Sequence, residues 1–181
     1  EKNKIDELAE GLKKFPNVDF AVYDGAKLPF NDDVFEGVIS FGTTVHDQDY
    51  FSLLSEAYRV SRKNILFDIR LTDQPELNSL NDSFVIDGSD VKYPYVVANI
   101  VQFFNWAIKQ KNLYRLSVYG YWGKSNSESK LPKGYKKICM AGVLMEKTGV
   151  KAKQNGKIEI SLDIPKTLLS DDIFHNYNKL K

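Results

Sequence analysis

The sequence predicts an α/β protein with a doubly wound, mainly parallel sheet and an antiparallel strand pair near its C-terminal end. Before residue 71, apolar runs that suit buried strands alternate with amphipathic helical patterns. Farther on, two strand patterns at 113–122 and 137–147 follow each other with no helical pattern between them. The composition, 43% hydrophobic and 27% charged, is typical of a globular protein with a sizeable core.

The N-terminal half alternates helix and strand patterns. Apolar residues recur at helical spacing from Ile5 to Phe15, and Pro16 ends this helix. Residues 18–23 and 36–41 are predicted to be buried strands. A second helix begins after Asp47 or Asp49, either of which can cap it. Its buried stripe comprises Phe51, Leu54, Ala57, Tyr58 and Val60. A third strand follows at 64–70.

The C-terminal half is less regular. Residues 71–92 are polar and are expected to form a long connection, whereas 93–110 have the apolar spacing of a helix. In the tail, 150–164 alternate with period two around Asn155-Gly156, which predicts a hairpin. We expect a short helix near 168–177. The prediction is therefore one domain over 1–148 and a C-terminal extension over 149–181.

Charge and composition exclude several classes of function. The formal net charge of +1 gives no electrostatic case for a nucleic-acid or membrane partner. The only cysteine, Cys139, cannot form an internal disulfide, and the first residues are too charged for a signal peptide, so we expect a cytoplasmic protein. With two histidines and one cysteine, we expect no metal site.

Polar and small residues follow two of the predicted strands. Ligands of an open parallel sheet bind beyond the carboxyl ends of its strands. Asp24, Gly25 and Ala26 follow the first strand, and Ser40–Gly42 end the second. A carboxylate that accepts a hydrogen bond, beside backbone N–H groups that donate one, matches the edge of an adenine. The competing interpretation is an ordinary Asp-Gly turn.

The wider pattern resembles the class I S-adenosylmethionine-dependent methyltransferases, in particular their small-molecule branch. The similar segments are "NVDFAVYDGAKLPFNDDVFEGVIS" from Asn17 and "LLSEAYRVSRKNILFDIR" from Leu53. The resemblance spans about 1–148 and is most specific over 17–70. It implies a Rossmann-like fold, S-adenosylmethionine as cofactor and methyl transfer to a small-molecule acceptor.

The resemblance also implies roles for single residues. Asp24 binds the adenine amino group, the backbone of Gly25 and Ala26 meets the ring, and Leu28 packs nearby. The turn Ser40-Phe41-Gly42 contacts the methionine part of the cofactor. For Leu28, core packing is the competing interpretation.

His46 lies in the loop after the strand at 36–41, where a general base could take a proton from the acceptor. Its alternative role is to cap the next helix or to face solvent. Four aromatic residues are candidates for the wall of an acceptor pocket, although ordinary core packing is the preferred interpretation: Tyr93, Tyr95, Tyr121 and Trp122. Arg70 could reach an anionic acceptor or lie on the surface.

One departure from the family leaves other functions open. The glycine-rich loop of the family is absent, so the sequence looks like a domain without its first strand, first helix and second strand, and we expect this chain alone to be inactive. A non-catalytic interaction or structural domain is the main alternative, and a fragment of a nicotinamide-dependent oxidoreductase is a weaker one. The tail is expected to pair with a sheet edge or a second subunit, which leaves a homo-oligomer open.

Overall fold

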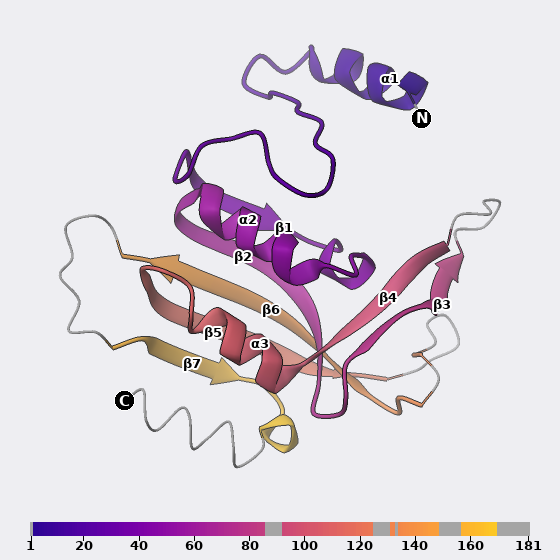
Figure 1. The fold of residues 1–181 in the computed structure, drawn as a ribbon, viewed down its shortest axis with the longest axis vertical. Helices are drawn as coiled ribbons and strands as arrows, with labels where there is room; N and C mark the ends of the chain where they lie inside the picture. The colour runs from indigo at the N-terminus through magenta and orange to yellow at the C-terminus, as the bar shows by residue number, and fades with distance from the viewer. Residues whose placement is uncertain (1, 86–91, 125–130, 133, 149–156, 170–181) are drawn as a thin grey trace.

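The computed structural model describes residues 2–85, 92–124, 131–132, 134–148 and 157–169. Within this part the strands form one seven-stranded sheet in the order β3-β4-β2-β6-β5-β7, and β1 also pairs with β2. The strands are β1 (Phe35–Ser40), β2 (Ser61–Thr72), β3 (Leu77–Val85), β4 (Lys92–Asn99), β5 (Leu113–Gly123), β6 (Ile138–Lys147) and β7 (Glu159–Asp163). One sheet with helices packed on it (Figure 1) confirms the predicted α/β class.

Strand directions in this sheet are mixed. β2 is the central strand: it runs parallel to β1 and β4 and antiparallel to β6. β5 and β6 form the antiparallel pair that the sequence predicts. β7 lies parallel to β5 at the sheet edge. The predicted parallel arrangement is therefore found at β1 and β2, whereas both neighbours of β6 are antiparallel to it.

The helices are α1 (Lys2–Leu12), α2 (Tyr50–Val60) and α3 (Ile100–Ala107), with short 3-10 turns η1 (Thr44–His46) and η2 (Lys166–Leu168). α2 and α3 cover the same face of the sheet (Figure 1). The main core lies between these two helices and the sheet, and its most buried members include Leu54, Ile65, Phe67, Phe103, Leu116, Val143 and Met145. None of the helices described is long and apolar enough to cross a membrane.

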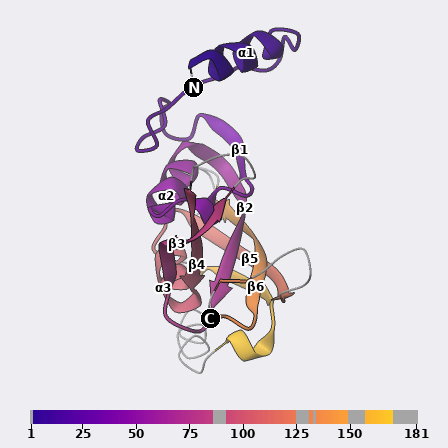
Figure 2. The ribbon, with the colours of Figure 1, turned by 90° about the vertical axis from the view of Figure 1, so that its right-hand side faces the viewer.

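The predicted strand at 18–23 is wrong. These residues form no strand, and Val18, Phe20, Val22 and Tyr23 are 40–58% exposed. The segment before β1 runs outside the sheet together with α1, as both views show (Figures 1 and 2). A strand rich in apolar residues on both faces requires a neighbouring strand and cover on each face. β1, the next strand along the chain, pairs within the described part only with β2; its Ile39 is 70% exposed, and Phe41, directly after the strand, is 58% exposed.

The predicted helix at 93–110 is correct only in its second half. The structure has β4 up to Asn99 and α3 from Ile100. Asn99 sets the boundary, because its side chain accepts hydrogen bonds from the N–H groups of Val101 and Gln102 and so caps the helix. The residues before it, including Val96 and Val97, suit a strand as well as a helix, and pairing with β3 decides between the two.

The predicted polar connection at 71–92 is also corrected. β2 continues to Thr72, and Leu77–Val85 form β3, which pairs antiparallel with β4. Polar residues are compatible with this strand because β3 is an edge strand of the sheet.

The C-terminal extension is described in part. Its strand β7 corresponds to the second arm of the predicted hairpin, and it pairs with β5. The turn at Asn155-Gly156 and most of the helix expected at 168–177 lie outside the described residues; Lys166–Leu168 form a single 3-10 turn. The division into 1–148 and 149–181 stays a prediction.

Candidate functional site

The turn after β1 is tied to the neighbouring strand β2. Gly42 has a φ of +69°, which glycine adopts without strain. Its N–H donates to Oδ1 of Asp68 at 2.7 Å. The Thr44 hydroxyl donates to the Asp68 carbonyl at 2.6 Å, and the Ser40 hydroxyl donates to the Thr43 hydroxyl at 3.1 Å. The predicted cofactor-binding turn Ser40–Gly42 is thus held by Asp68, a residue that the sequence did not single out.

Asp24 forms a compact turn with the residues that follow it. Its Oδ1 accepts the N–H of Ala26 at 2.9 Å and that of Lys27 at 3.4 Å, while Gly25 has a φ of +88°. These hydrogen bonds, that of Ala26 first, lower the pKa of the Asp24 carboxyl below its ordinary value. The side chain is exposed and ionised at neutral pH, and the hydrogen bonds from Ala26 and Lys27 both reach Oδ1.

Leu28 is fixed by the end of helix α2. Its N–H donates to Oε2 of Glu56 at 2.9 Å, and its carbonyl accepts from the guanidinium of Arg59 at 3.1 Å. The Leu28 side chain is half-buried, which agrees in part with the core-packing interpretation. The Arg59 hydrogen bond spans 31 positions along the chain, so local sequence patterns contain no signal for it.

His46 lies at the end of η1 and contacts β4. Its Nδ1 is 3.0 Å from the carbonyl oxygen of Pro94, and its ring packs edge-on against Tyr93 with centroids 6.0 Å apart. A carbonyl oxygen only accepts hydrogen bonds, so Nδ1 carries the proton in the neutral ring and Nε2 is the basic nitrogen. This tautomer is compatible with a general base.

The aromatic residues proposed for an acceptor pocket lie on two strands, β4 and β5, and differ widely in burial. Tyr95 is 8% exposed and packs in a small core cluster, whereas Tyr121 is 63% exposed. Trp122 lies under the ammonium of Lys137, whose Nζ is 4.0 Å from the ring centroid. Tyr93 contacts a predicted site residue, His46.

Arg70 is engaged within the sheet. Its guanidinium donates to Oδ2 of Asp68 at 3.1 Å, and its side chain is 23% exposed. The same carboxylate holds the amide of Gly42 through its other oxygen. Arg70 therefore supports the turn after β1 through Asp68 and is not a free surface arginine.

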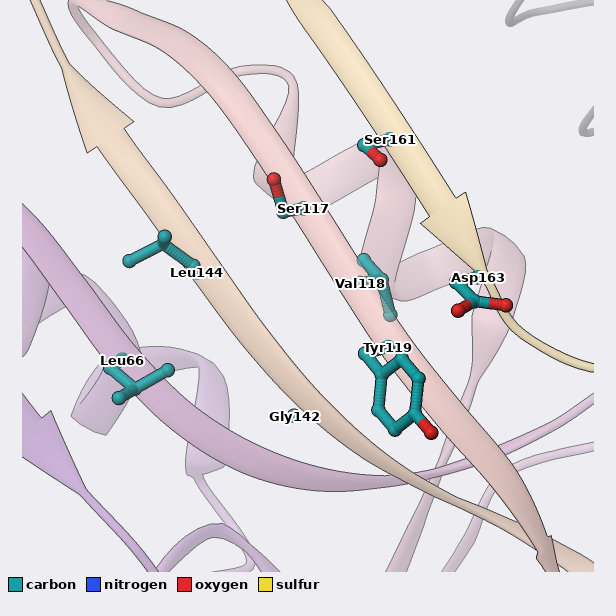
Figure 3. A pocket seen from close by; sticks show the side chains of 8 residues that line it. All are labelled: Leu66, Ser117, Val118, Tyr119, Gly142, Leu144, Ser161 and Asp163. Carbon is teal, nitrogen blue, oxygen red and sulfur yellow. The ribbon is translucent and has the colours of Figure 1, made fainter.

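A cavity of about 350 Å³ opens on the sheet face opposite α2 and α3. Figure 3 shows its lining, which comes from four neighbouring strands: Leu66, Ser117, Val118, Tyr119, Gly142, Leu144, Ser161 and Asp163. No predicted site residue lines it. The described residues also contain no cluster of three or more histidine, cysteine or acidic side chains able to hold a metal ion.

The predicted site residues thus form two anchored segments. Asp24–Leu28 are fixed to α2 through Glu56, and Ser40–Gly42 are fixed to β2 through Asp68. His46 is attached to β4 through Pro94. The assignment of these residues to a cofactor stays a prediction.

Comparison with known proteins identifies the segment that holds these residues. Residues 2–67 match the family model described as a methyltransferase domain. No curated protein matches the sequence. Among solved structures, the chain is similar to the PH0226 protein from Pyrococcus horikoshii OT3, with 16% identity and a TM-score of 0.42 over 82% of this chain and 68% of that one. The match over residues 2–67 confirms the resemblance to class I methyltransferases that the motifs of this segment carry.

Proposed function

We propose that the protein transfers a methyl group from S-adenosylmethionine to a small-molecule acceptor. The observation that carries this proposal is the methyltransferase-domain match over 2–67, because every predicted site residue, from Asp24 to His46, lies inside it. The net charge of +1 supports a small acceptor over nucleic acid or an anionic membrane. A cytoplasmic location fits the thiol of Cys139, which is free and buried and whose pKa burial raises to about 11.

The residues present fit an adenine ring. The exposed carboxylate of Asp24 keeps Oδ2 as an acceptor for the ring's amino group. Gly25 has no side chain, and an added Cβ there would meet nothing within 4 Å, so a flat ring can approach the backbone. The N–H of Ala26 donates to Asp24 in this structure. To donate to a ring nitrogen of adenine instead, it must first give up this hydrogen bond.

In the proposed reaction the protein mainly positions two reactants. S-adenosylmethionine supplies a methyl group that its sulfonium already activates. The turn Ser40–Gly42, held by Asp68, would hold the methionine part, and correct alignment of the two reactants would provide much of the rate. Nε2 of His46 takes a proton from a hydroxyl or amine of the acceptor, while Nδ1 keeps its hydrogen bond to Pro94.

A second candidate function is a non-catalytic methyltransferase-like domain that serves in interaction or structure. It is favoured by the Ala26 amide, whose hydrogen bond to Asp24 already satisfies the donor that adenine requires. In this interpretation, Asp24-Gly25 is an ordinary turn. Cofactor binding separates the two functions.

The test is the affinity of the full-length protein for S-adenosylmethionine, measured by isothermal titration. We expect Asp24→Ala to weaken binding roughly ten- to a hundredfold, because a hydrogen bond to a charged acceptor is lost, and Asp24→Asn to weaken it less. Asp19→Ala is the control, because it removes an exposed carboxylate from the same segment. If wild type does not bind, the non-catalytic function is favoured; if Asp24→Ala binds as tightly as wild type while folded, the adenine assignment is wrong.

A further inference from the structure

Arg59, near the end of α2, uses its whole guanidinium to hold the segment that follows Asp24. Its Nε and Nη2 donate to the two carboxylate oxygens of Glu56, both at 2.7 Å. Nη1 donates to the Phe30 carbonyl and to Oδ1 of Asp32, both at 2.8 Å, and Nη2 also donates to the Leu28 carbonyl at 3.1 Å. A guanidinium has five N–H donors, and these hydrogen bonds engage every one.

Glu56 is the second member of this arrangement. It lies one helical turn before Arg59, on the same face of α2, and forms a bidentate pair with it. Its Oε2 also accepts the N–H of Leu28, so the backbone of Leu28 is held on both its donor and its acceptor. The side chains of Glu56 and Arg59 are only 17% and 21% exposed, which limits competition from water.

The far end of the segment is fixed as well. The N–H of Asp33 donates to the backbone carbonyl of Arg59 at 2.9 Å, and its carboxylate accepts from Nζ of Lys147 at 2.9 Å. The Lys147 side chain is 8% exposed and also donates to the Ser61 carbonyl. We name residues Leu28–Asp33 the clamped loop. Its backbone is attached to α2 at both ends, and the side chain of Asp33 also attaches it to β6.

We propose that Arg59, together with Glu56, is a positioning residue for the cofactor: it fixes the clamped loop and thereby the turn Asp24–Ala26, which ends two residues before it. This inference rests on the proposed function. The turn has no strand to support it, since 18–23 lie outside the sheet. The hydrogen bonds at Leu28 are therefore its nearest attachment to the folded core, and a site held in advance loses less freedom on binding.

The geometry also explains why arginine and not lysine occupies this position. The acceptors are a carboxylate with two oxygens, two backbone carbonyls and a second carboxylate, arranged around one planar group. Lysine has three donors on a single atom and cannot form the bidentate contact. Arg59→Lys keeps the positive charge but removes the planar guanidinium. It therefore distinguishes the effect of the charge from the effect of the hydrogen-bond geometry.

The test compares Arg59→Gln and Arg59→Lys with a matched control, Arg62→Gln. The Arg62→Gln substitution also removes an ion pair, the one between Arg62 and Glu36 at 2.8 Å. The Arg62 side chain is, however, 53% exposed and has no hydrogen bond to the clamped loop. The first measurement is amide hydrogen exchange at Leu28 and Asp33 in the full-length protein without cofactor. The second is the dissociation constant for S-adenosylmethionine. Circular dichroism and urea unfolding verify that each variant is folded.

We expect Arg59→Gln to raise the exchange rate at Leu28 at least about tenfold and to weaken cofactor binding about tenfold. For Arg59→Lys we expect an exchange rate and a dissociation constant between those of wild type and Arg59→Gln. This variant also serves as the less disruptive change if Arg59→Gln unfolds. Arg62→Gln leaves both quantities unchanged. An unchanged exchange rate in both Arg59 variants would show that Arg59 does not fix the clamped loop. Faster exchange with an unchanged dissociation constant would show that Arg59 does not position the cofactor.

The outcomes also separate this inference from the proposed function. If the wild-type protein does not bind S-adenosylmethionine, the proposed function fails, and the cofactor role of Arg59 fails with it. The exchange difference between Arg59→Gln and Arg62→Gln is measured without cofactor, so it still confirms or refutes the clamped loop itself.

Discussion

The carbonyl oxygen of Pro94 fixes the tautomer of His46, and this single contact decides which ring nitrogen is basic. Nδ1 donates to the carbonyl across 3.0 Å, so Nε2 holds the lone pair in the neutral ring. The contact also joins η1 to β4, two elements far apart in the sequence.

We expect His46→Ala to lower the turnover of the full-length enzyme roughly a hundredfold while leaving the affinity for S-adenosylmethionine nearly unchanged, because a general base acts on the chemical step. The measurement is kcat in a methyl-transfer assay, with the dissociation constant determined in parallel. Gln48→Ala is the control, since it truncates an exposed side chain in the same loop. Equal turnover in His46→Ala and wild type would leave His46 a structural loop residue.

The pair Glu56–Arg59 predicts a dependence of stability on pH. The hydrogen bond from Arg59, chiefly, lowers the pKa of Glu56 in the folded state below its ordinary value. The unfolded chain therefore takes up this proton first as pH falls. The stabilisation is complete above the ordinary glutamate pKa of about 4.3 and is lost as pH falls through the lower pKa of the folded state.

We therefore expect Glu56→Gln to reduce the free energy of unfolding by about 1–3 kcal/mol near neutral pH, and the gap from wild type to narrow as the pH is lowered below about 4. Urea unfolding across this pH range measures both quantities. Asp19→Asn, which changes an exposed carboxylate, is the control. A gap that stays constant down to about pH 3 would contradict the assigned pKa shift.

At the scale of elements, the contact between β5 and β6 is so close that glycine is required at one position. A Cβ on Gly120 would lie 2.7 Å from Sγ of Cys139 and 3.0 Å from the carbonyl oxygen of Met140. Gly142, on the neighbouring strand, would place a Cβ in open space, with no atom within 4 Å. The two glycines form a matched pair in one sheet.

We expect Gly120→Ala to destabilise the fold by about 1–3 kcal/mol, the usual cost of overpacking, and Gly142→Ala to be neutral or slightly stabilising. Urea unfolding monitored by circular dichroism gives both values. If the two substitutions have the same effect, the strand contact is looser than the structure indicates.

Elements with a single consistent pattern were predictable from the sequence. The helix at 50–60 has one apolar stripe, and the strands at 36–41 and 64–70 are short apolar runs next to it, so local pattern and final fold agree. Residues 93–110 have apolar side chains at both helical and strand spacing, and only pairing with β3 and the Asn99 cap resolve the choice. The strand at 18–23 fails for a similar reason, because a strand depends on neighbours that its own sequence does not specify.

At the scale of the whole molecule, the fold class followed from sequence pattern, but the contacts that hold the predicted site residues did not. Asp24 and Gly42 are recognisable because small and acidic residues follow apolar runs. Asp68, Glu56 and Arg59 act across 26 to 31 positions of the chain. Such long-range hydrogen bonds depend on how β2 and α2 come together, and this arrangement is set by packing of the core and not by local propensity.

The exposed apolar side chains of β1 determine how the chain behaves in concentrated solution. Ile39 is 70% exposed on β1, which pairs, within the described residues, only with β2, and Phe41, directly after this strand, is 58% exposed. An exposed apolar edge strand is a site of aggregation, so we expect this 181-residue chain to self-associate as its concentration rises.

Ile39→Lys should raise the concentration at which light scattering first increases and change the free energy of unfolding by less than about 0.5 kcal/mol. Val38→Lys, at a partly buried position packed against the core, should unfold the protein instead. If Ile39→Lys and wild type scatter light equally, the chain self-associates through a surface other than β1. The colloidal stability of the chain is thus set by the edge strand that leads directly into the predicted cofactor turn.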